Sequence, residues 1–327
     1  MTKSKKKLVV VDADTLVFQS AAVSEERSVL VKHLPSEREK IYKNRTEFKN
    51  AMKEKNFVVN PDDFTFEDIQ EEQPIENCLH TIKLQAQKII DRFPKHEIIW
   101  CCGDRDNFRL ELELPIQYKI NRSTRLRPIH LSKAKEYFCN KFNAVSGNGY
   151  ECDDLSIILA YEGKNKGRDV VLLSPDKDSR QAVGLNLFDY TNPDKGSIEL
   201  GDWHPIELNQ KKEFKSYGIP FLAYQLLRGD GSDGWWPYKL AGKEFGDTGA
   251  YKLLKDCQTA KECLEVVVKQ YQKWYQEPIT YTAWDSKEYT KNWKDILQLY
   301  FYCAKMKQHE DDMLIAEEFF DMYGVKL

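Results

Sequence analysis

The stretch of sequence best suited to chemistry is a short acidic segment at residues 149–154. Glu151, Asp153 and Asp154 fall within four residues, and an apolar helical run follows at residues 155–160. One acidic residue at a helix start is explained by capping and by the helix dipole. Three like charges this close repel one another unless a cation lies among them. Because oxygen ligands without nearby His or Cys suit Mg²⁺ or Mn²⁺ better than zinc, the segment predicts a divalent metal site.

Further carboxylates follow three runs of apolar residues that predict buried parallel strands. The runs cover residues 8–11, 97–102 and 170–173, and the acids that follow them are Asp12, Asp104, Asp176 and Asp178. Ligands of open α/β sheets collect at the carboxyl ends of the strands, so these acids are expected at one edge. For Asp12, capping of the helix expected at residues 15–22 stays open as an alternative.

The last acidic pair, Asp230 and Asp233, lies in a glycine-rich loop at residues 228–234. Ordinary turn chemistry explains such a loop as well. A sheet edge with this much negative charge needs cations, and two divalent ions would offset it. Two-metal sites stabilise both the attacking and the leaving oxygen of a phosphodiester displacement.

Basic side chains gather beside an aromatic one downstream of the second predicted strand. The residues concerned are Arg109, Tyr118, Lys119, Arg122, Arg125 and Arg127. Cations bind phosphates and a tyrosine can stack on a base, so the cluster predicts contact with nucleic acid. A basic surface loop is the alternative. Lys243 lies in a second glycine-rich stretch, whose backbone amides can hold a phosphate or can simply form turns.

Composition excludes several classes of function. The chain has 327 residues and a net charge of −3, so no overall basic field points to nucleic acid. No apolar run reaches membrane-spanning length, and the basic start is not a signal peptide. Eight cysteines without a C-x-x-C pair indicate reduced thiols in the cytoplasm. Neither a Walker-A loop nor a G-x-G-x-x-G motif is present, which counts against nucleotide and dinucleotide binding.

Two domains are expected. An α/β core would cover residues 1–205, with a densely charged insertion at about residues 24–73 that carries its own small structure. A helical C-terminal region at residues 206–327 would complete the metal site and bind duplex. Its aromatic residues, such as Trp274, Trp284 and Trp293, are interpreted as core.

The order of these motifs resembles the flap endonuclease / 5′-nuclease superfamily, and is most similar to the bacteriophage 5′→3′ exonucleases. The motifs are V-D-A-D, G-D-R-D-N-F-R with Y-K-I-N-R, E-C-D-D, S-P-D-K-D and R-G-D-G-S-D-G, within residues 8–255. The resemblance implies an α/β fold of the PIN-like / 5′-nuclease type. In this fold a mostly parallel central sheet is flanked by helices, with a helical arch and a helical C-terminal region.

The resemblance also implies roles for single residues. Asp12, Asp104, Glu151, Asp153 and Asp154 match the first metal cluster, and Asp176, Asp178, Asp230 and Asp233 match the second. Lys119 matches a catalytic lysine, Arg122 an arginine that binds the scissile phosphate, and Tyr118 a tyrosine that stacks on a base. We expect Arg109, Arg125, Arg127 and Lys243 to contact nucleic acid.

The implied activity is hydrolysis with two Mg²⁺ ions, replaceable by Mn²⁺, that leaves a 5′-phosphate and a 3′-hydroxyl. The expected enzyme is a monomeric 5′→3′ exonuclease or flap endonuclease of phage-type DNA replication or repair, in the host cytoplasm if phage-encoded. It would act on DNA with a free 5′ end or 5′ flap and on the RNA of RNA–DNA primers, with no membrane partner. A PIN-type single-strand RNA endonuclease and a non-catalytic nucleic-acid-binding protein are the alternatives. Residues 234–243 keep only fragments of the family's helix-two-turn-helix, which leaves a potassium-assisted grip on duplex open.

Overall fold

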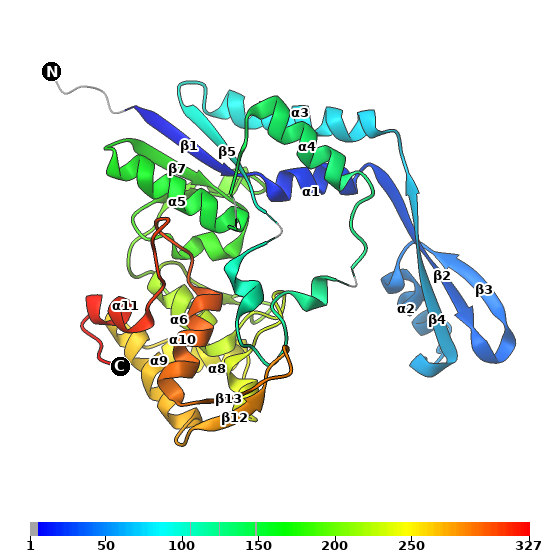
Figure 1. The fold of residues 1–327 in the computed structure, drawn as a ribbon. Helices are drawn as coiled ribbons and strands as arrows, with labels where there is room; N and C mark the ends of the chain where they lie inside the picture. The colour runs from blue at the N-terminus through cyan, green and yellow to red at the C-terminus, as the bar shows by residue number, and fades with distance from the viewer. Residues whose placement is uncertain (1–5, 105, 124, 148) are drawn as a thin grey trace. The chain divides into compact units, whose positions relative to one another are not determined.

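The computed structural model describes residues 6–104, 106–123, 125–147 and 149–327. The chain forms two compact units, whose elements are labelled in Figure 1. The first unit comprises Met1–Asp14, Arg92–Arg125 and Ala144–Leu327, and the second comprises Thr15–Asp91 and Leu126–Asn143. No helix among the described residues is both long enough and apolar enough to cross a membrane.

A six-stranded sheet organises the first unit, in the order β6-β5-β1-β7-β8-β9. The strands are β1 (Lys7–Asp12), β5 (Glu97–Cys102), β6 (Val145–Ser146), β7 (Asp169–Leu173), β8 (Asn186–Phe188) and β9 (Ser197–Glu199). All neighbours are parallel except β8 and β9, which confirms the predicted mostly parallel sheet. Because Asp12 pairs with Cys101, and Val11 with Leu173, the central strands end at the same edge.

Helix α5 (Cys152–Asn165) packs on strands β1, β5 and β7 of this sheet. Figure 1 shows the helix lying along β7 and β1. Leu8, Ile157 and Leu172 are among the buried side chains of the core that they share. Since α5 begins inside the acidic segment, directly after Glu151, this packing fixes Glu151 and Asp153 relative to the sheet.

Helices of the C-terminal half surround a second core in the same unit, built from residues such as Leu226, Tyr271 and Tyr300. They are α6 (Ile219–Arg228), α7 (Pro237–Leu240), α8 (Asp247–Leu254), α9 (Ala260–Trp274), α10 (Trp293–Ala304) and α11 (Ala316–Met322). A short hairpin of β10 (Glu207–Leu208) and β11 (Phe214–Lys215) precedes them. Leu114 and Tyr118 of the segment after β5 belong to this core as well.

The second unit holds the insertion, which has its own small structure as predicted. Its strands β2 (Glu25–His33), β3 (Arg38–Tyr42) and β4 (Phe64–Glu72) form an antiparallel sheet, and α2 (Arg45–Glu54) packs on β3. Val29, Val31 and Phe48 are buried members of its core. The unit also contains most of α1 (Asp14–Ala22) and α3 (Ile75–Arg92), and all of α4 (Leu131–Phe142).

The expected division at residue 205 stays a prediction, and in the structure the C-terminal helices share a compact unit with the six-stranded sheet. A hairpin of β12 (Ile279–Thr282) and β13 (Glu288–Lys291) interrupts the region expected to be helical, since its β-branched and aromatic residues alternate between two faces. The described residues between β5 and α4 form two short 3-10 turns, η3 (Phe108–Glu111) and η4 (Ile120–Arg122). Pro115 and Pro128 disfavour a longer helix there, and Arg105 and Thr124 of this segment lie outside the described residues.

Candidate metal centre

Two groups of three acidic side chains lie in the first unit. Their members are Glu151, Asp153 and Asp154, and Asp178, Asp230 and Asp233. Within each group one carboxylate oxygen per residue lies within 4.8 Å of the others. Six of the nine predicted metal ligands are therefore brought together, three in each predicted cluster. Neither group contains Asp12, Asp104 or Asp176.

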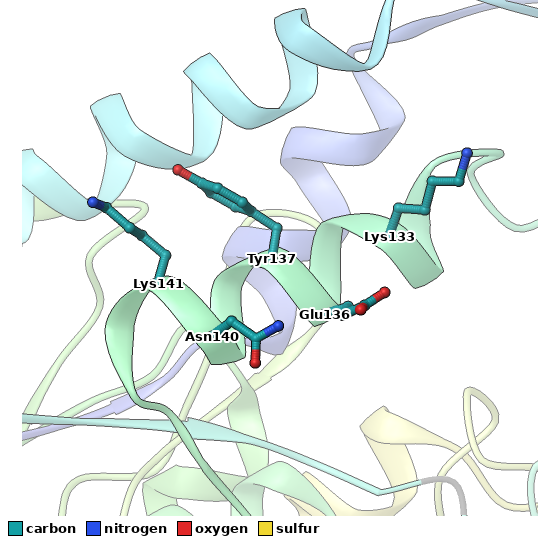
Figure 2. Close-up of a pocket in the computed structure, with 5 residues that line it drawn as sticks. All are labelled: Lys133, Glu136, Tyr137, Asn140 and Lys141. Atoms are coloured by element: carbon teal, nitrogen blue, oxygen red, sulfur yellow. The ribbon is translucent and has the colours of Figure 1, made fainter.

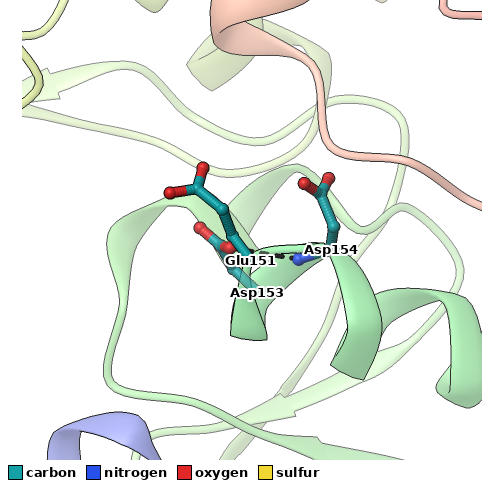
Figure 3. Close-up of side chains that lie close together, drawn as sticks. All are labelled: Glu151, Asp153 and Asp154. Atoms are coloured by element: carbon teal, nitrogen blue, oxygen red, sulfur yellow. Dashed lines mark hydrogen bonds between the residues drawn. The ribbon is translucent and has the colours of Figure 1, made fainter. Parts of the chain in front are cut away.

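The first group lies at the start of α5, where Glu151 is the residue before the helix. Its carboxylate makes no capping hydrogen bond, so capping does not explain its position. Figure 3 shows the three side chains there, with the carboxylate of Asp154 turned away from that of Asp153. Gly103, just after β5, allows a close approach, because a Cβ at this position would lie 2.5 Å from the amide nitrogen of Cys152.

The second group combines a turn after β7 with the loop after α6. Asp178 lies in the 3-10 turn η5 (Lys177–Gln181). The loop is closed by two backbone hydrogen bonds between Asp230 and Trp235, of 2.9 and 3.1 Å. Gly229 makes this closure possible, since its φ is +74° and a Cβ there would lie 2.3 Å from the carbonyl oxygen of Trp235. Asp230 also accepts bonds from the amide and hydroxyl of Ser232, so turn chemistry holds one of its oxygens.

The three remaining predicted ligands lie at the ends of strands but outside both groups. Asp12 is buried, and its oxygens accept hydrogen bonds from the amide of Asp14 and the hydroxyl of Ser174. Asp176 is exposed and caps η5 by accepting the amide of Asp178 at 2.9 Å. Asp104 is exposed, and its amide donates to the carbonyl of Tyr150 at 3.0 Å. One carboxylate oxygen of Asp12 and one of Asp176 are therefore occupied by a capping-type bond from a nearby backbone amide.

Burial and the repulsion between neighbouring carboxylates raise the pKa of several acidic side chains in this region. Burial, and then the charge of Asp14, raise the pKa of Asp12 to about 6. Burial followed by Glu151 raises the pKa of Asp153 well above its usual value, and burial followed by Asp176 does the same for Asp178. Asp176 contributes to all three of these shifts, so its charge links the strand ends to both groups. Clustered carboxylates with raised pKa values are the expected signature of a site that takes a cation.

Basic side chains of η4 and its preceding residue reach both groups. Lys119 pairs with Glu151 and lies 3.7 Å from Asp233, and Arg122 pairs with Asp233. Lys119 has a left-handed backbone with φ of 59°, held by a 2.8 Å bond from its amide to the carbonyl of Asp233. Such a backbone is uncommon outside glycine, and here the surrounding contacts maintain it. The structure thus places the two predicted catalytic residues at the acidic groups.

Lys177 is a member of the site that the sequence analysis did not select. Its ammonium lies 2.7 Å from a carboxylate oxygen of Asp230. The available signal was its place between Asp176 and Asp178 in the S-P-D-K-D motif. Lys177 and Arg122 keep side chains 42% and 44% exposed, and Lys119 19%. These long side chains can move aside when a divalent ion takes up the carboxylates.

The predicted base-stacking role of Tyr118 does not agree with the structure. Its side chain is 2% exposed, so no face of the ring is open to a base. The hydroxyl instead lies 2.8 Å from Asp233 and 3.2 Å from Glu151, and bridges the two groups. A phenol has one proton to donate, so it satisfies one of these carboxylates at a time.

The predicted nucleic-acid contact of Arg109 is also corrected. Its side chain is completely buried. The guanidinium forms a two-pronged ion pair with Asp154 and a 3.2 Å contact with Glu151, which compensate its buried charge. Burial alone would raise the pKa of Asp154, but the charge and hydrogen bonds of Arg109, the amide of Lys307 and the charge of Lys119 together outweigh burial and lower it. Asp154 is therefore held by a guanidinium rather than presented to a metal ion.

The other predicted contacts, Arg125, Arg127 and Lys243, are exposed. Their nucleic-acid role stays a prediction. The second unit has a shallow hollow on α4, lined by Lys133, Glu136, Tyr137, Asn140 and Lys141 and drawn in Figure 2. Because it offers a single carboxylate, it is not a competing metal site.

The residues present fit two hard divalent cations, since both groups offer only oxygen ligands. Glu151, Asp230 and Asp233 are now neutralised by Lys119, Lys177 and Arg122, so the protein's own cations hold the positions that ions would share.

Comparisons with known proteins give partial likenesses. No protein-family model matches the chain. It is 30% identical to DNA polymerase I of Caldicellulosiruptor bescii over 119 residues, which make up 36% of this chain and 13% of that protein. It is 31% identical to DNA polymerase I of Mycobacterium tuberculosis over 146 residues, or 44% of this chain and 16% of that protein. The chain thus spans less than a fifth of the length of these relatives.

Solved structures from bacteriophage T5 are also similar. A 5′-exonuclease with bound zinc ions is 17% identical, with a TM-score of 0.45 over 81% of this chain and 79% of that one. A flap endonuclease in a complex with DNA and metal ions is 12% identical, with a TM-score of 0.48 over 97% and 96%.

Proposed function

We propose that the chain belongs to the 5′-nuclease family and is a metal-dependent 5′→3′ exonuclease or flap endonuclease. The observation that carries this proposal is the pair of acidic groups, with Lys119 in contact with both and Arg122 in contact with the second. A purely structural site has no need for two carboxylate triads that are mutually repulsive. A non-catalytic nucleic-acid-binding protein has no need for them either.

Each residue has a role in the proposed reaction. Glu151 and Asp153 would hold one Mg²⁺, and Asp178, Asp230 and Asp233 the other, with Asp12, Asp104, Asp154 and Asp176 around them. The ions, when bound, supply hydroxide near neutral pH and stabilise the attacking and leaving oxygens. Lys119 and Arg122 would leave their carboxylates and stabilise charge growing on the phosphate oxygens.

For the substrate we propose DNA with a free 5′ end or a 5′ flap, and the RNA of RNA–DNA primers. The sequence similarity to part of DNA polymerase I supports DNA and a role in replication or repair. Exposed Arg125, Arg127 and Lys243 are the proposed contacts to the phosphate backbone. We further propose that a monomer acts in the cytoplasm and that Mn²⁺ replaces Mg²⁺.

Product analysis on three labelled substrates tests the proposal. A 5′-flap, a nicked duplex and an RNA-primed duplex are each incubated with Mg²⁺ and with a chelator. We expect products with a 5′-phosphate and a 3′-hydroxyl in Mg²⁺ only. Asp153→Asn should abolish cleavage and keep DNA binding, whereas Glu136→Gln in the α4 hollow should cleave normally.

Two results would contradict the assignment. Full activity of Asp153→Asn would show that the first acidic group takes no part in the reaction. Equal cleavage of single-stranded RNA with a free and a blocked 5′ end would instead identify a PIN-type RNA endonuclease.

A further inference from the structure

A short segment at residues 304–307, which we call the strap, leaves the end of α10 and runs through the interior of the first unit. Ala304, Lys305 and Met306 are at most 4% exposed. Side chains from distant elements contact its backbone at four successive residues. A buried backbone requires such partners. Here each of these side chains either belongs to an acidic group or is connected to one by further hydrogen bonds.

One arm joins the strap to the first acidic group through Arg109. Nε and Nη2 of Arg109 donate to the carbonyls of Tyr302 and Lys305, both at 3.0 Å. Nη2 also contacts Asp154, and Nη1 contacts Asp154 and Glu151. The amide of Lys307 donates to the same carboxylate of Asp154 at 2.9 Å. Asp154 is thereby fixed from two sides, and Glu151 is positioned through the same guanidinium.

A second arm joins the strap to the second acidic group through two glutamines. Gln181 donates to the carbonyl of Ala304 at 2.7 Å and accepts the amide of Met306 at 3.0 Å. Its amide nitrogen also lies 3.3 Å from the side-chain oxygen of Gln225. Gln225 in turn donates to Asp178 at 2.6 Å. Both glutamines are 2% exposed.

The order of donors and acceptors makes the second arm directional. Because the oxygen of Gln181 accepts from Met306, its nitrogen faces Ala304 and Gln225. The oxygen of Gln225 therefore faces Gln181, and its nitrogen must point to Asp178. A buried polar network of this kind has one fully satisfied arrangement, and it fixes the orientation of the carboxylate at its end.

We propose that the strap is the common anchor of both metal groups, and that Arg109, Gln181 and Gln225 are positioning residues that hold the ligands against it. This inference rests on the proposed function, because it assigns the two groups to metal ions. It follows that Gln181 controls metal affinity indirectly. Its side chain bonds to the strap and to Gln225, and Gln225 in turn bonds to Asp178.

Calorimetric titration of the full-length protein with Mn²⁺ tests this role. We expect Gln181→Leu and Gln225→Leu each to weaken binding of one Mn²⁺ by roughly 10- to 100-fold, the range found for partners that orient metal ligands. Ser179→Ala is the control for Gln181, since Ser179 is buried in the same turn and its hydroxyl has no hydrogen-bond partner among the residues that the structure describes. Tyr224→Phe is the control for Gln225, since it removes a hydrogen bond to Asp247 from the same helix. Both controls should bind Mn²⁺ within twofold of wild type.

The outcomes separate this inference from the proposed function. If wild type binds Mn²⁺ and cleaves DNA but both leucine variants keep wild-type affinity, the strap does not position the ligands. If Gln181→Leu fails to fold, the Mn²⁺ affinity of Gln225→Leu decides alone. A wild-type protein that binds no Mn²⁺ contradicts the proposed function itself. Melting temperatures in chelator show whether any loss of affinity merely follows a loss of stability.

Discussion

Two kinds of basic side chain neutralise the acidic groups. Lys119, Arg122 and Lys177 reach the carboxylates from partly exposed positions. Arg109 is completely buried and makes every contact within the protein. In the proposed reaction the first kind would exchange a carboxylate for a phosphate, whereas the second cannot leave without exposing a buried charge. At the scale of single residues, exposure therefore separates the cations proposed to react from the structural one.

This difference predicts the stability of Arg109 variants. Arg109→Met leaves the carboxylate of Asp154 buried without its partner, which should lower the free energy of unfolding by about 3–5 kcal/mol. The double variant Arg109→Met/Asp154→Leu removes both charges and should recover most of that loss. Urea unfolding in chelator measures all three proteins. Equal stability of the single and double variants would show that the ion pair is not the source of the effect.

The raised pKa of Asp12 predicts a pH dependence of stability. Its pKa is about 6 in the folded protein and about 3.9 in an unfolded chain. The stabilisation that its neutral form gives is complete below the unfolded pKa and is lost as pH rises through about 6. Asp12→Asn should therefore stabilise the chelated protein by roughly 1–3 kcal/mol more at pH 8 than at pH 4, by the free energy of a two-unit pKa shift.

Urea unfolding of wild type and Asp12→Asn at the two pH values checks this difference. Asp189→Asn is a control of opposite sign, because hydrogen bonds from Thr191 and Asn192 outweigh burial and lower the pKa of that carboxylate, so this variant should lose more stability at pH 8 than at pH 4. A stability difference for Asp12→Asn that does not change with pH would contradict the assigned shift.

Among the elements, those with continuous apolar runs were the most predictable. The strands β1, β5 and β7 have the predicted places, because a buried parallel strand leaves an uninterrupted signal. The carboxylates that follow them could be predicted for the same reason. The hairpin β12–β13 was missed because its tyrosines and flanking tryptophans resembled the stripe of a buried helix.

The sequence does not show which residues contact the buried polar side chains. Arg109 lies near other basic residues in the sequence, and nothing there shows that Asp154 will enclose it. Gln225 gave a weak signal, as an amide in the apolar helix α6. Which carboxylate it would orient depends on contacts between residues 47 positions apart.

The loop after α6 is the element in which a single backbone position should matter most. Gly229→Ala places a methyl group 2.3 Å from the carbonyl of Trp235 at a φ of +74°. We expect a loss of more than about 1 kcal/mol in stability, because alanine is strained at positive φ. Weaker Mn²⁺ binding should accompany it, because the loop carries Asp230 and Asp233.

Gly246→Ala is the matched control, because a Cβ there meets nothing within 4 Å and its φ is −142°. Thermal unfolding and Mn²⁺ titration of both variants measure the two effects. Equal behaviour of the two would mean that the closed loop does not depend on glycine at residue 229.

On the scale of the whole molecule, the two acidic groups and the insertion belong to different compact units. Both acidic groups, their basic partners and the strap belong to the first unit. The insertion has its own core in the second unit, and its ends meet, since the amide of Gln73 donates to the carbonyl of Ser24 at 3.1 Å. Within that unit it holds residues 127–129, through Gln70 to the carbonyl of Arg127 and Glu25 to the amide of Ile129.

Replacing residues 25–72 by a short Gly-Ser linker should therefore leave Mn²⁺ binding within about twofold of wild type, because no ligand or positioning residue is removed. The same deletion should make the chain around residues 127–129 more sensitive to protease, since two of its anchors are lost. Calorimetry and limited proteolysis measure these two effects, and Gln70→Leu, which removes one anchor, should give intermediate protease sensitivity. A deletion variant that folds but binds no Mn²⁺ would show that the metal groups depend on the insertion. Comparing its cleavage of flap, nicked and RNA-primed substrates then shows whether the insertion selects among them.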